Sequence, residues 1–245
     1  MTRIRLRYSK HGKVRFLSHR DMAKVVERAI RRAKVPVAYS EGFSPRPKLH
    51  FGLALSTGYE SGAEYLDLDL DPDRVGVREP EAIAEALQPC MPAGVVITAS
   101  AALEPGEPSL QDVVTSTAWQ VDLATDIAGD PADLAGRADN LLAAATHEIE
   151  IVRKGKQVRE DLRPLLLALS VEPTGGVEPI TERARLTFEL GTKPRSVRPA
   201  ELLAALGVSE PVCMLRTHQW IQRDGRRFEP LGLPDASPHA EARAS

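Results

Sequence analysis

The residues with the most evident chemical potential in this 245-residue sequence are the cations of its first fifty positions. Residues 1–50 contain 14 Lys and Arg against 3 Asp and Glu, whereas residues 51–245 contain 18 against 31. The net charges are therefore +11 and −13, although the whole chain carries only −2. So basic a segment is typical of a surface that binds a polyanion. The alternative is a solvated, salt-bridged surface that the acidic remainder neutralises.

Three elements are expected to position these cations. Residues 3–8 alternate Arg with apolar side chains, which predicts a strand with one basic face. From Ser18, an N-cap candidate, apolar residues recur at spacings of three and four, which predicts a helix with a basic outer side. Residues 40–48 include Pro45 and Pro47, so they are expected to form a stiff loop. The predicted phosphate contacts are Arg3, Arg5, Arg7, Arg20, Lys24, Arg28, Arg31, Arg46 and Lys48.

Phe43 and two histidines complete the set of candidate site residues. Phe43 follows Gly42 in the basic loop, where it could stack on a base, or it could instead pack into the core. His19 and His50 lie among basic residues, so either could serve as acid or base in metal-independent RNA cleavage. The alternative for both histidines is a local hydrogen-bonding role, and His11 is expected to be solvated in a turn.

The sequence offers little support for metal or cofactor chemistry within this chain. Cys90 and Cys213 are the two cysteines, too few for an iron–sulfur cluster or a zinc ribbon. No Gly-rich phosphate loop, Cys-x-x-Cys pair or His-Glu-x-x-His motif occurs. Residues 67–73 superficially resemble a calcium loop, but Pro72 stands where that loop needs glycine. We therefore expect neither a metal site nor a bound cofactor.

The order of the predicted elements indicates the fold. Residues 1–105 predict strand, helix, strand, strand, helix and strand, which is the order of a ferredoxin-like unit. A similar order recurs over residues 106–225. We therefore expect an α+β protein of two tandem ferredoxin-like (βαββαβ) units with antiparallel sheets. Residues 226–245 lose periodicity and are expected to form a disordered tail.

Four short motifs occur together near the N-terminus. They are Phe16-Leu17-Ser18-His19-Arg20-Asp21, Glu27-Arg28-Ala29, Tyr39-Ser40-Glu41-Gly42-Phe43-Ser44-Pro45-Arg46-Pro47 and Gly58-Tyr59-Glu60-Ser61-Gly62-Ala63-Glu64. Together they resemble the bacterial radical SAM-linked protein family, most strongly over residues 1–72 and diffusely to about residue 223. That family is a domain of unknown function found beside, or fused to, a radical SAM protein with a cobalamin-binding-like region. It has no established catalytic residues to carry over.

The resemblance implies a partner, the radical SAM protein, in which the iron–sulfur cluster and SAM are expected. The leading hypothesis is a non-catalytic accessory protein that recognises structured RNA for this partner. A cytoplasmic location without membrane contact is expected, since the sequence has few cysteines and no export signal. Two alternatives stay open, a metal-independent RNA-processing endonuclease and a protein–protein adaptor without nucleic-acid binding.

Overall fold

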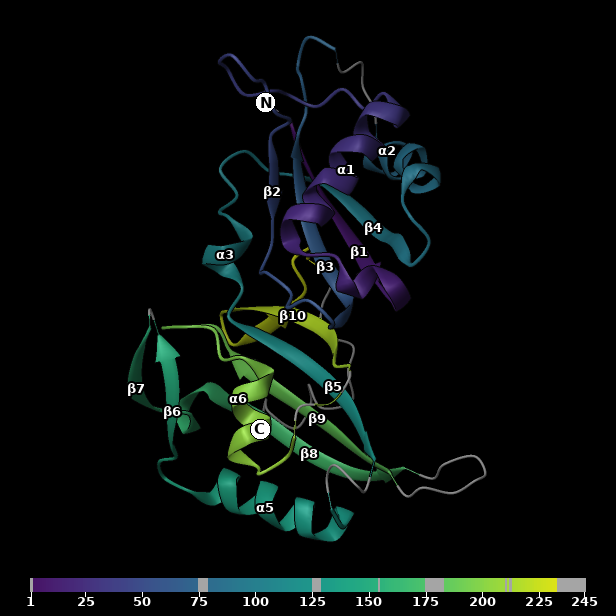
Figure 1. Ribbon diagram of the computed structural model, residues 1–245. Coiled ribbons are helices and arrows are strands. Elements are labelled where there is room, and N and C mark those ends of the chain that lie inside the picture. Colours follow the sequence, from purple (N-terminus) through teal and green to yellow (C-terminus); the bar gives the residue numbers. More distant parts are fainter. Residues whose placement is uncertain are drawn as a thin grey trace. The chain divides into compact units, whose positions relative to one another are not determined.

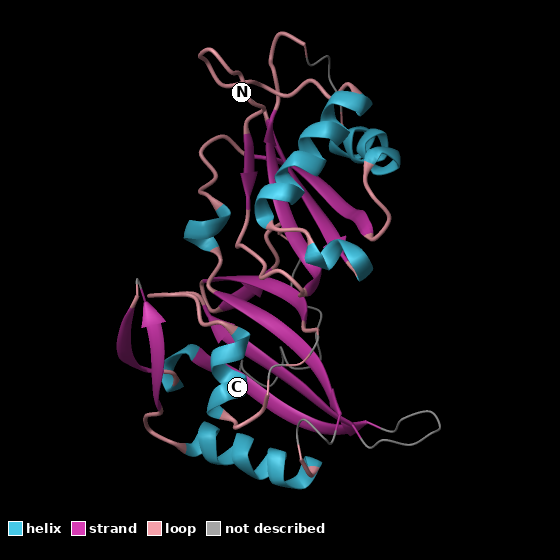
Figure 2. Ribbon diagram, in the orientation of Figure 1, coloured by secondary structure: helices cyan, strands magenta, loops and turns pink. Residues whose placement is uncertain are grey.

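The structure is a computed structural model of the chain. It describes residues 2–74, 79–124, 129–153, 155–174, 183–209, 211 and 213–232. These residues form a mixed α+β fold with mostly antiparallel strands and five α-helices (Figure 1, Figure 2). Two compact units divide the chain: unit 1 is Met1–Val114 with Gln219–Ser245, and unit 2 is Thr115–His218. This division differs from the predicted boundaries after residues 105 and 225, because residues 219–232 pack within unit 1.

In unit 1, the predicted order of strands and helices over residues 1–105 is confirmed. The elements are β1 (Arg3–Lys10), η1 (Gly12–Phe16), α1 (His19–Ala33), β2 (Leu49–Phe51), β3 (Glu60–Asp69), α2 (Pro80–Leu87), η2 (Gln88–Cys90), β4 (Val95–Leu103) and α3 (Leu110–Val113). Near the C-terminus, β10 (Leu215–Arg223) ends in this unit and is followed by β11 (Arg226–Phe228). All strand pairs between β4, β1, β3 and β2, in that order, are antiparallel.

One face of this sheet is apolar and carries both long helices of the unit, α1 and α2 (Figure 1). Ile4 and Leu6 of β1 and Leu66 and Leu68 of β3 project to this face and are buried. They pack against the buried stripe of α1, whose residues are Met22, Val26, Ala29 and Ile30. The stripe forms because these residues recur every three or four positions, on one side of the helix.

The start of α1 is set by a local cap. Ser18 has an extended backbone, and its Oγ accepts a hydrogen bond from the Asp21 backbone N at 3.2 Å. The same Oγ donates to Asp21 Oδ2 at 2.7 Å, which makes the interaction reciprocal. The helix therefore begins where the sequence predicted.

The opposite face of the sheet is charged. The register of β1 and β3 places Arg3 opposite Asp69 and Arg5 opposite Asp67. Arg5 Nε and Nη2 donate to the two carboxylate oxygens of Asp67 at 2.7 and 2.9 Å, and its Nη1 donates to the Pro230 carbonyl oxygen at 2.9 Å. The Arg5 and Asp67 side chains are only 1% and 2% exposed. The acidic run at the end of β3 thus neutralises the basic face of β1.

The prediction of a disordered tail from residue 226 is wrong for its first seven residues. β11 forms a hairpin with β10, with Arg226 opposite Arg223. Glu229 and Pro230 follow and are buried. Arg7 Nη2 donates to Glu229 Oε1 at 3.3 Å, so this segment is held to β1 by charge as well as by burial. Residues 233–245 of the predicted tail lie outside the described residues.

Unit 2 contains a second antiparallel sheet and a separate hairpin. Its elements are β5 (Ser116–Ala124), α5 (Pro131–Ala143), β6 (Glu148–Arg153), β7 (Lys156–Asp161), η3 (Arg163–Leu165), β8 (Leu166–Thr174), β9 (Arg183–Gly191), α6 (Pro199–Ala205) and the first four residues of β10. β9 pairs with β5 on one side and with β8 on the other, while β6 and β7 pair only with each other among the described residues. A tandem ferredoxin-like arrangement stays a prediction. Within the described ranges, no helix combines the length and apolar character needed to cross a membrane.

The buried pair of Arg5 and Asp67 should be essential for the stability of unit 1. Replacing Arg5 by Ala leaves a buried carboxylate unpaired, and the free energy of unfolding should fall by about 3–5 kcal/mol. The control is Arg185→Ala, since Arg185 makes the same two-bond contact with Asp122, at 2.7 and 2.9 Å, in a pair that is over one third exposed. That control should cost only about 0–1 kcal/mol.

Urea denaturation of the two variants measures this difference. A second variant, Arg5→Met with Asp67→Leu, should be more stable than Arg5→Ala because it buries no unpaired charge. Equal losses for Arg5→Ala and Arg185→Ala would contradict the assignment.

Candidate nucleic-acid interface

The three predicted phosphate contacts on β1 are all engaged within the fold. Arg5 is buried against Asp67, and Arg3 Nε donates to Asp69 Oδ1 at 2.6 Å. Arg7 reaches Glu229, as described above. For β1, therefore, the structure has the salt-bridged surface that was the alternative to polyanion binding. The register of β1 with β3 is what brings each arginine to a carboxylate.

The cations of α1 are in a different situation. Arg20, Lys24, Arg28 and Arg31 are all exposed. Lys24 Nζ lies 3.5 Å from Asp21 Oδ1, which is a weak contact at the surface. Arg28 and Arg31 have no ion-pair partner among the described residues. The helix thus presents cations that the protein itself leaves uncompensated.

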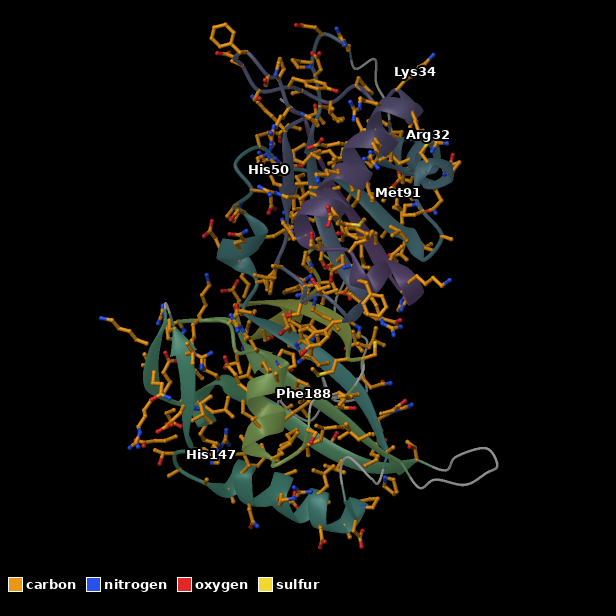
Figure 3. All side chains as sticks on the ribbon, in the orientation of Figure 1. Arg32, Lys34, His50, Met91, His147 and Phe188 are labelled. Carbon is orange, nitrogen blue, oxygen red and sulfur yellow. The ribbon has the colours of Figure 1, made fainter. Side chains whose placement is uncertain are left out.

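Two further cations extend this basic face, although they were absent from the predicted contacts. Arg32 and Lys34 are exposed at the C-terminal end of α1 (Figure 3). Arg32 continues the four-residue spacing of Arg20, Lys24 and Arg28, a signal that is visible in the sequence. A row of cations twelve residues long extends about 18 Å along a helix. We call the exposed side chains of Arg20, Lys24, Arg28, Arg31, Arg32 and Lys34 the basic stripe.

The basic stripe has a cost for the isolated helix. Like charges four residues apart destabilise a helix, because their side chains lie one turn apart on the same side. Cations in the last turn are favoured by the helix dipole, which accounts for Arg31 and Arg32 but not for Arg20 and Lys24. Asp21 and Glu27 are the acids of the helix, too few to alternate with the cations. A binding role would explain why the row is kept.

The loop predicted at residues 40–48 is a hairpin-like projection. The Ser40 backbone N donates to the Arg46 carbonyl, and the Lys48 N donates to the Ala38 carbonyl, both at 2.8 Å. Gly42 lies at the tip with a φ of +119°, a conformation that side chains disfavour. Pro45 and Pro47 stiffen the returning arm. We call residues 38–48 the finger.

The finger is fastened to β3 at its base. The Ala38 backbone N donates to the Asp69 carbonyl at 2.8 Å, and the Asp69 N donates to the Lys48 carbonyl at 3.2 Å. Both arms of the finger therefore continue the hydrogen bonding of the sheet, and only its tip projects away from it.

Phe43 at the tip of the finger is fully exposed, with 110% of its reference accessible surface. The alternative that it packs into the core is therefore wrong. Arg46 is exposed and Lys48 is half-buried, and neither has a side-chain ion pair among the described residues. An exposed aromatic ring beside two cations is the arrangement that stacks on a nucleobase while its neighbours meet phosphates.

The two candidate catalytic histidines lie on opposite sides of β2. His50 Nε2 lies 3.1 Å from Asp69 Oδ2, on the charged face of the sheet. His19, the first residue of α1, contacts the ring of Phe51 edge-on with centroids 5.0 Å apart. Because His50 and Phe51 are consecutive in a strand, their side chains point to opposite faces. The structure does not bring the two histidines together as an acid–base pair.

Asp69 holds His50 as a carboxylate. Its burial raises the pKa, but the hydrogen bonds from Arg3 and His50 outweigh burial, and the pKa of Asp69 is lowered from its ordinary value. An ionised Asp69 can orient the His50 ring by accepting a proton-bearing nitrogen. His50 is nevertheless 48% exposed on its side chain, and this local pairing is the hydrogen-bonding role given above as the alternative.

Two features near the N-terminus were not anticipated. His11, expected to be solvated, has its Nδ1 3.0 Å from Glu60 Oε2, and Glu60 Oε1 accepts from the Gly12 backbone N at 2.8 Å. Phe16 is 58% exposed, with the Arg15 guanidinium 4.6 Å above its ring centroid. This second exposed aromatic residue has no periodic signal in the sequence that would separate it from a core position.

Other sites of the described residues offer less. No group of three or more His, Cys, Asp and Glu side chains is placed to hold a metal ion in the described part of the chain. A groove of about 600 Å³ in unit 1 is lined by both signs of charge, including Glu107, Asp224, Arg223 and Arg226. Its mixed charge makes it less suited to a polyanion than the basic stripe.

The fold and this surface define a small α+β protein with an exposed basic helix and a projecting aromatic finger. Over residues 3–199 the chain matches the family described as "Uncharacterized protein conserved in bacteria" (DUF2344), and it belongs to that family. No curated protein matches the chain.

A solved structure with a similar chain is "Crystal Structure of a Cbf5-Nop10-Gar1 Complex". The identity is 8% and the TM-score 0.49, over 88% of this chain and 48% of that chain. The chain thus spans about half the length of the chain it matches. None of these comparisons names a radical SAM protein or assigns a function to this one.

Proposed function

We propose that this protein is a non-catalytic accessory protein that binds RNA through the basic stripe and the finger. One observation carries the proposal: Arg28, Arg31 and Arg32 are exposed on one helix and have no ion-pair partner within the described residues. Phosphates would supply the missing negative charge and release counterions on binding. Arg3, Arg5 and Arg7 are not part of this proposed interface.

The finger favours RNA over an acidic protein as the ligand. An acidic protein surface would satisfy the cations of α1 but would gain little from the exposed ring of Phe43. Unpaired bases of RNA loops offer flat faces on which an aromatic side chain can stack. The rigid arms of the finger would hold Phe43 in place before binding, which lowers the entropic cost of that contact.

The RNA would be a substrate for a partner enzyme. The four N-terminal motifs resemble the radical SAM-linked family, which points to a radical SAM protein with a cobalamin-binding-like region as that partner. With two cysteines, this chain has too few thiolates for the cluster such an enzyme needs. The antiparallel order β4-β1-β3-β2 supports a ferredoxin-like unit 1 in this proposal.

Affinity purification from cells tests this association. The tagged chain, recovered after RNase treatment, should retain the radical SAM protein, as identified by mass spectrometry. Recovery of no such protein, with RNA still bound before RNase treatment, would remove the partner and leave the RNA proposal standing.

One observation keeps the endonuclease alternative in view. The contact between His50 and Asp69 is the kind that orients an imidazole for proton transfer. However, metal-independent cleavage needs both an acid and a base, and His19 lies on the other face of the sheet. Binding without cleavage is therefore the function that the geometry supports best.

Removing three charges of the basic stripe should weaken RNA binding. For Arg28→Gln/Arg31→Gln/Arg32→Gln, the slope of log K against log salt concentration should become shallower by about 2, at about 0.7 per lost phosphate contact. Fluorescence anisotropy with single-stranded polyuridine in EDTA measures this slope. The matched control, Arg153→Gln/Arg159→Gln/Arg198→Gln, removes the same charge from exposed positions of unit 2 and should bind like the wild type.

Two outcomes would contradict this proposal. An equal loss in both triple variants would show that only net charge matters, and no binding by the wild type at low salt would remove the RNA function. Cleavage of the probe in EDTA would favour the endonuclease.

Replacing Phe43 by Ala should weaken binding by about 1–3 kcal/mol, the value of one base stacked on an aromatic ring. The salt slope should stay unchanged, because no charge is lost. Stability should change by less than about 0.5 kcal/mol, since the ring is fully exposed. Phe43→Trp should retain the affinity, and the same anisotropy titrations measure all three proteins. Wild-type affinity for Phe43→Ala would exclude stacking while leaving the role of α1 intact.

A further inference from the structure

Strand β4 forms an edge of the sheet in unit 1 and is unusual in composition. Among the described residues, it pairs only with β1. Its nine residues, Val95–Leu103, include neither a charged residue nor a proline. Proteins normally protect such edges with charges, prolines or very short strands, because unpaired backbone groups invite another strand.

The other edge strands of this protein show these protections. β8, an edge of the sheet in unit 2, contains Glu172 and Pro173. β2 is only three residues long. Of the described strands longer than three residues, β4 alone lacks a charged residue. The absence of charge on β4 is therefore a local property and does not reflect the composition of the chain.

Part of the β4 edge is already covered by a side chain. Gln88 Nε2 donates to the Val95 carbonyl at 3.2 Å, and Gln88 Oε1 accepts from the Ile97 backbone N at 2.7 Å. This amide takes the place of a neighbouring strand over the first three residues. Beyond it, Ala99–Leu103 has no described partner on its outer side, as Figure 1 shows for this edge of unit 1.

We propose that Ala99–Leu103 pairs antiparallel with the same segment of a second copy of this chain. A twofold axis through a strand edge generates an antiparallel pair of identical strands. A strand that pairs with itself meets its own charges, so charges of one sign would repel, and a charge-free strand avoids this in every register. A strand built for another protein has no such restriction and usually gains from opposite charges.

The side chains of this segment suit a close pairing. Ala99, Ser100, Ala101 and Ala102 are small, so a second copy meets no bulky side chain beside the backbone. With the twofold axis near Ala101, Ser100 of one copy lies opposite Ala102 of the other. Such cross-strand neighbours have Cβ atoms about 4.5–5.5 Å apart. A charge at both positions would therefore face like charges twice in the dimer.

The test is the oligomeric state of the full chain, measured by analytical ultracentrifugation over about a hundredfold range of concentration. The wild type should form a dimer. Ser100→Lys/Ala102→Lys should be monomeric, and so should Ser100→Glu/Ala102→Glu. Mixing these two variants should restore a dimer, because opposite charges then face each other. Circular dichroism confirms that each variant is folded, and Ala102→Lys alone, at an exposed position, replaces either variant that is not.

The matched control places two lysines on the other edge strand. Leu167→Lys/Ser170→Lys changes exposed residues of β8 and should leave the dimer intact. A wild type that stays monomeric would overturn the proposal, including the case in which β4 takes a strand of another protein. A dimer that survives in the lysine variant of β4 would also overturn it.

Discussion

The contact between Arg5 and Asp67 is the constraint around which unit 1 is organised. It places an arginine and a carboxylate at the centre of a sheet, both nearly inaccessible to water. Charges so deeply buried are tolerated only when every donor and acceptor is matched, and Arg5 meets this condition with Asp67 and the carbonyl of Pro230. One side chain thus fixes the register of β1 with β3 and ties the C-terminal segment to the N-terminal strand.

This constraint separates the cations of the N-terminus into two groups. Those on β1 are consumed by the fold, because the carboxylates of β3 and Glu229 lie against them. Those on α1 lie on the side of the helix that faces away from the core, where no described carboxylate compensates Arg28, Arg31 or Arg32. The charge available to a ligand is therefore smaller than the composition suggests, but it is concentrated on one helix and one finger.

Much of the local structure could be predicted from the sequence, since it depends on neighbours along the chain. The cap at Ser18 and the apolar stripe of α1 follow from spacings of three and four residues, and the helix begins where they indicate. The finger was predicted only as a stiff loop, because its paired arms depend on contacts with β3. The exposure of Phe43 could not be predicted either, since a phenylalanine beside a glycine suits a core and a projecting tip equally well.

By itself, the sequence determined which residues are charged, where α1 begins and that no cluster ligands are present in sufficient number. Only the tertiary structure decided which cations remain free. An alternating strand such as β1 shows that its arginines share a face, but not whether that face meets water or carboxylates. That depends on strands and segments more than 60 and 220 residues away, such as Asp67 and Pro230 for Arg5. Electrostatic compensation depends on distance in space, and distance along the chain does not reveal it.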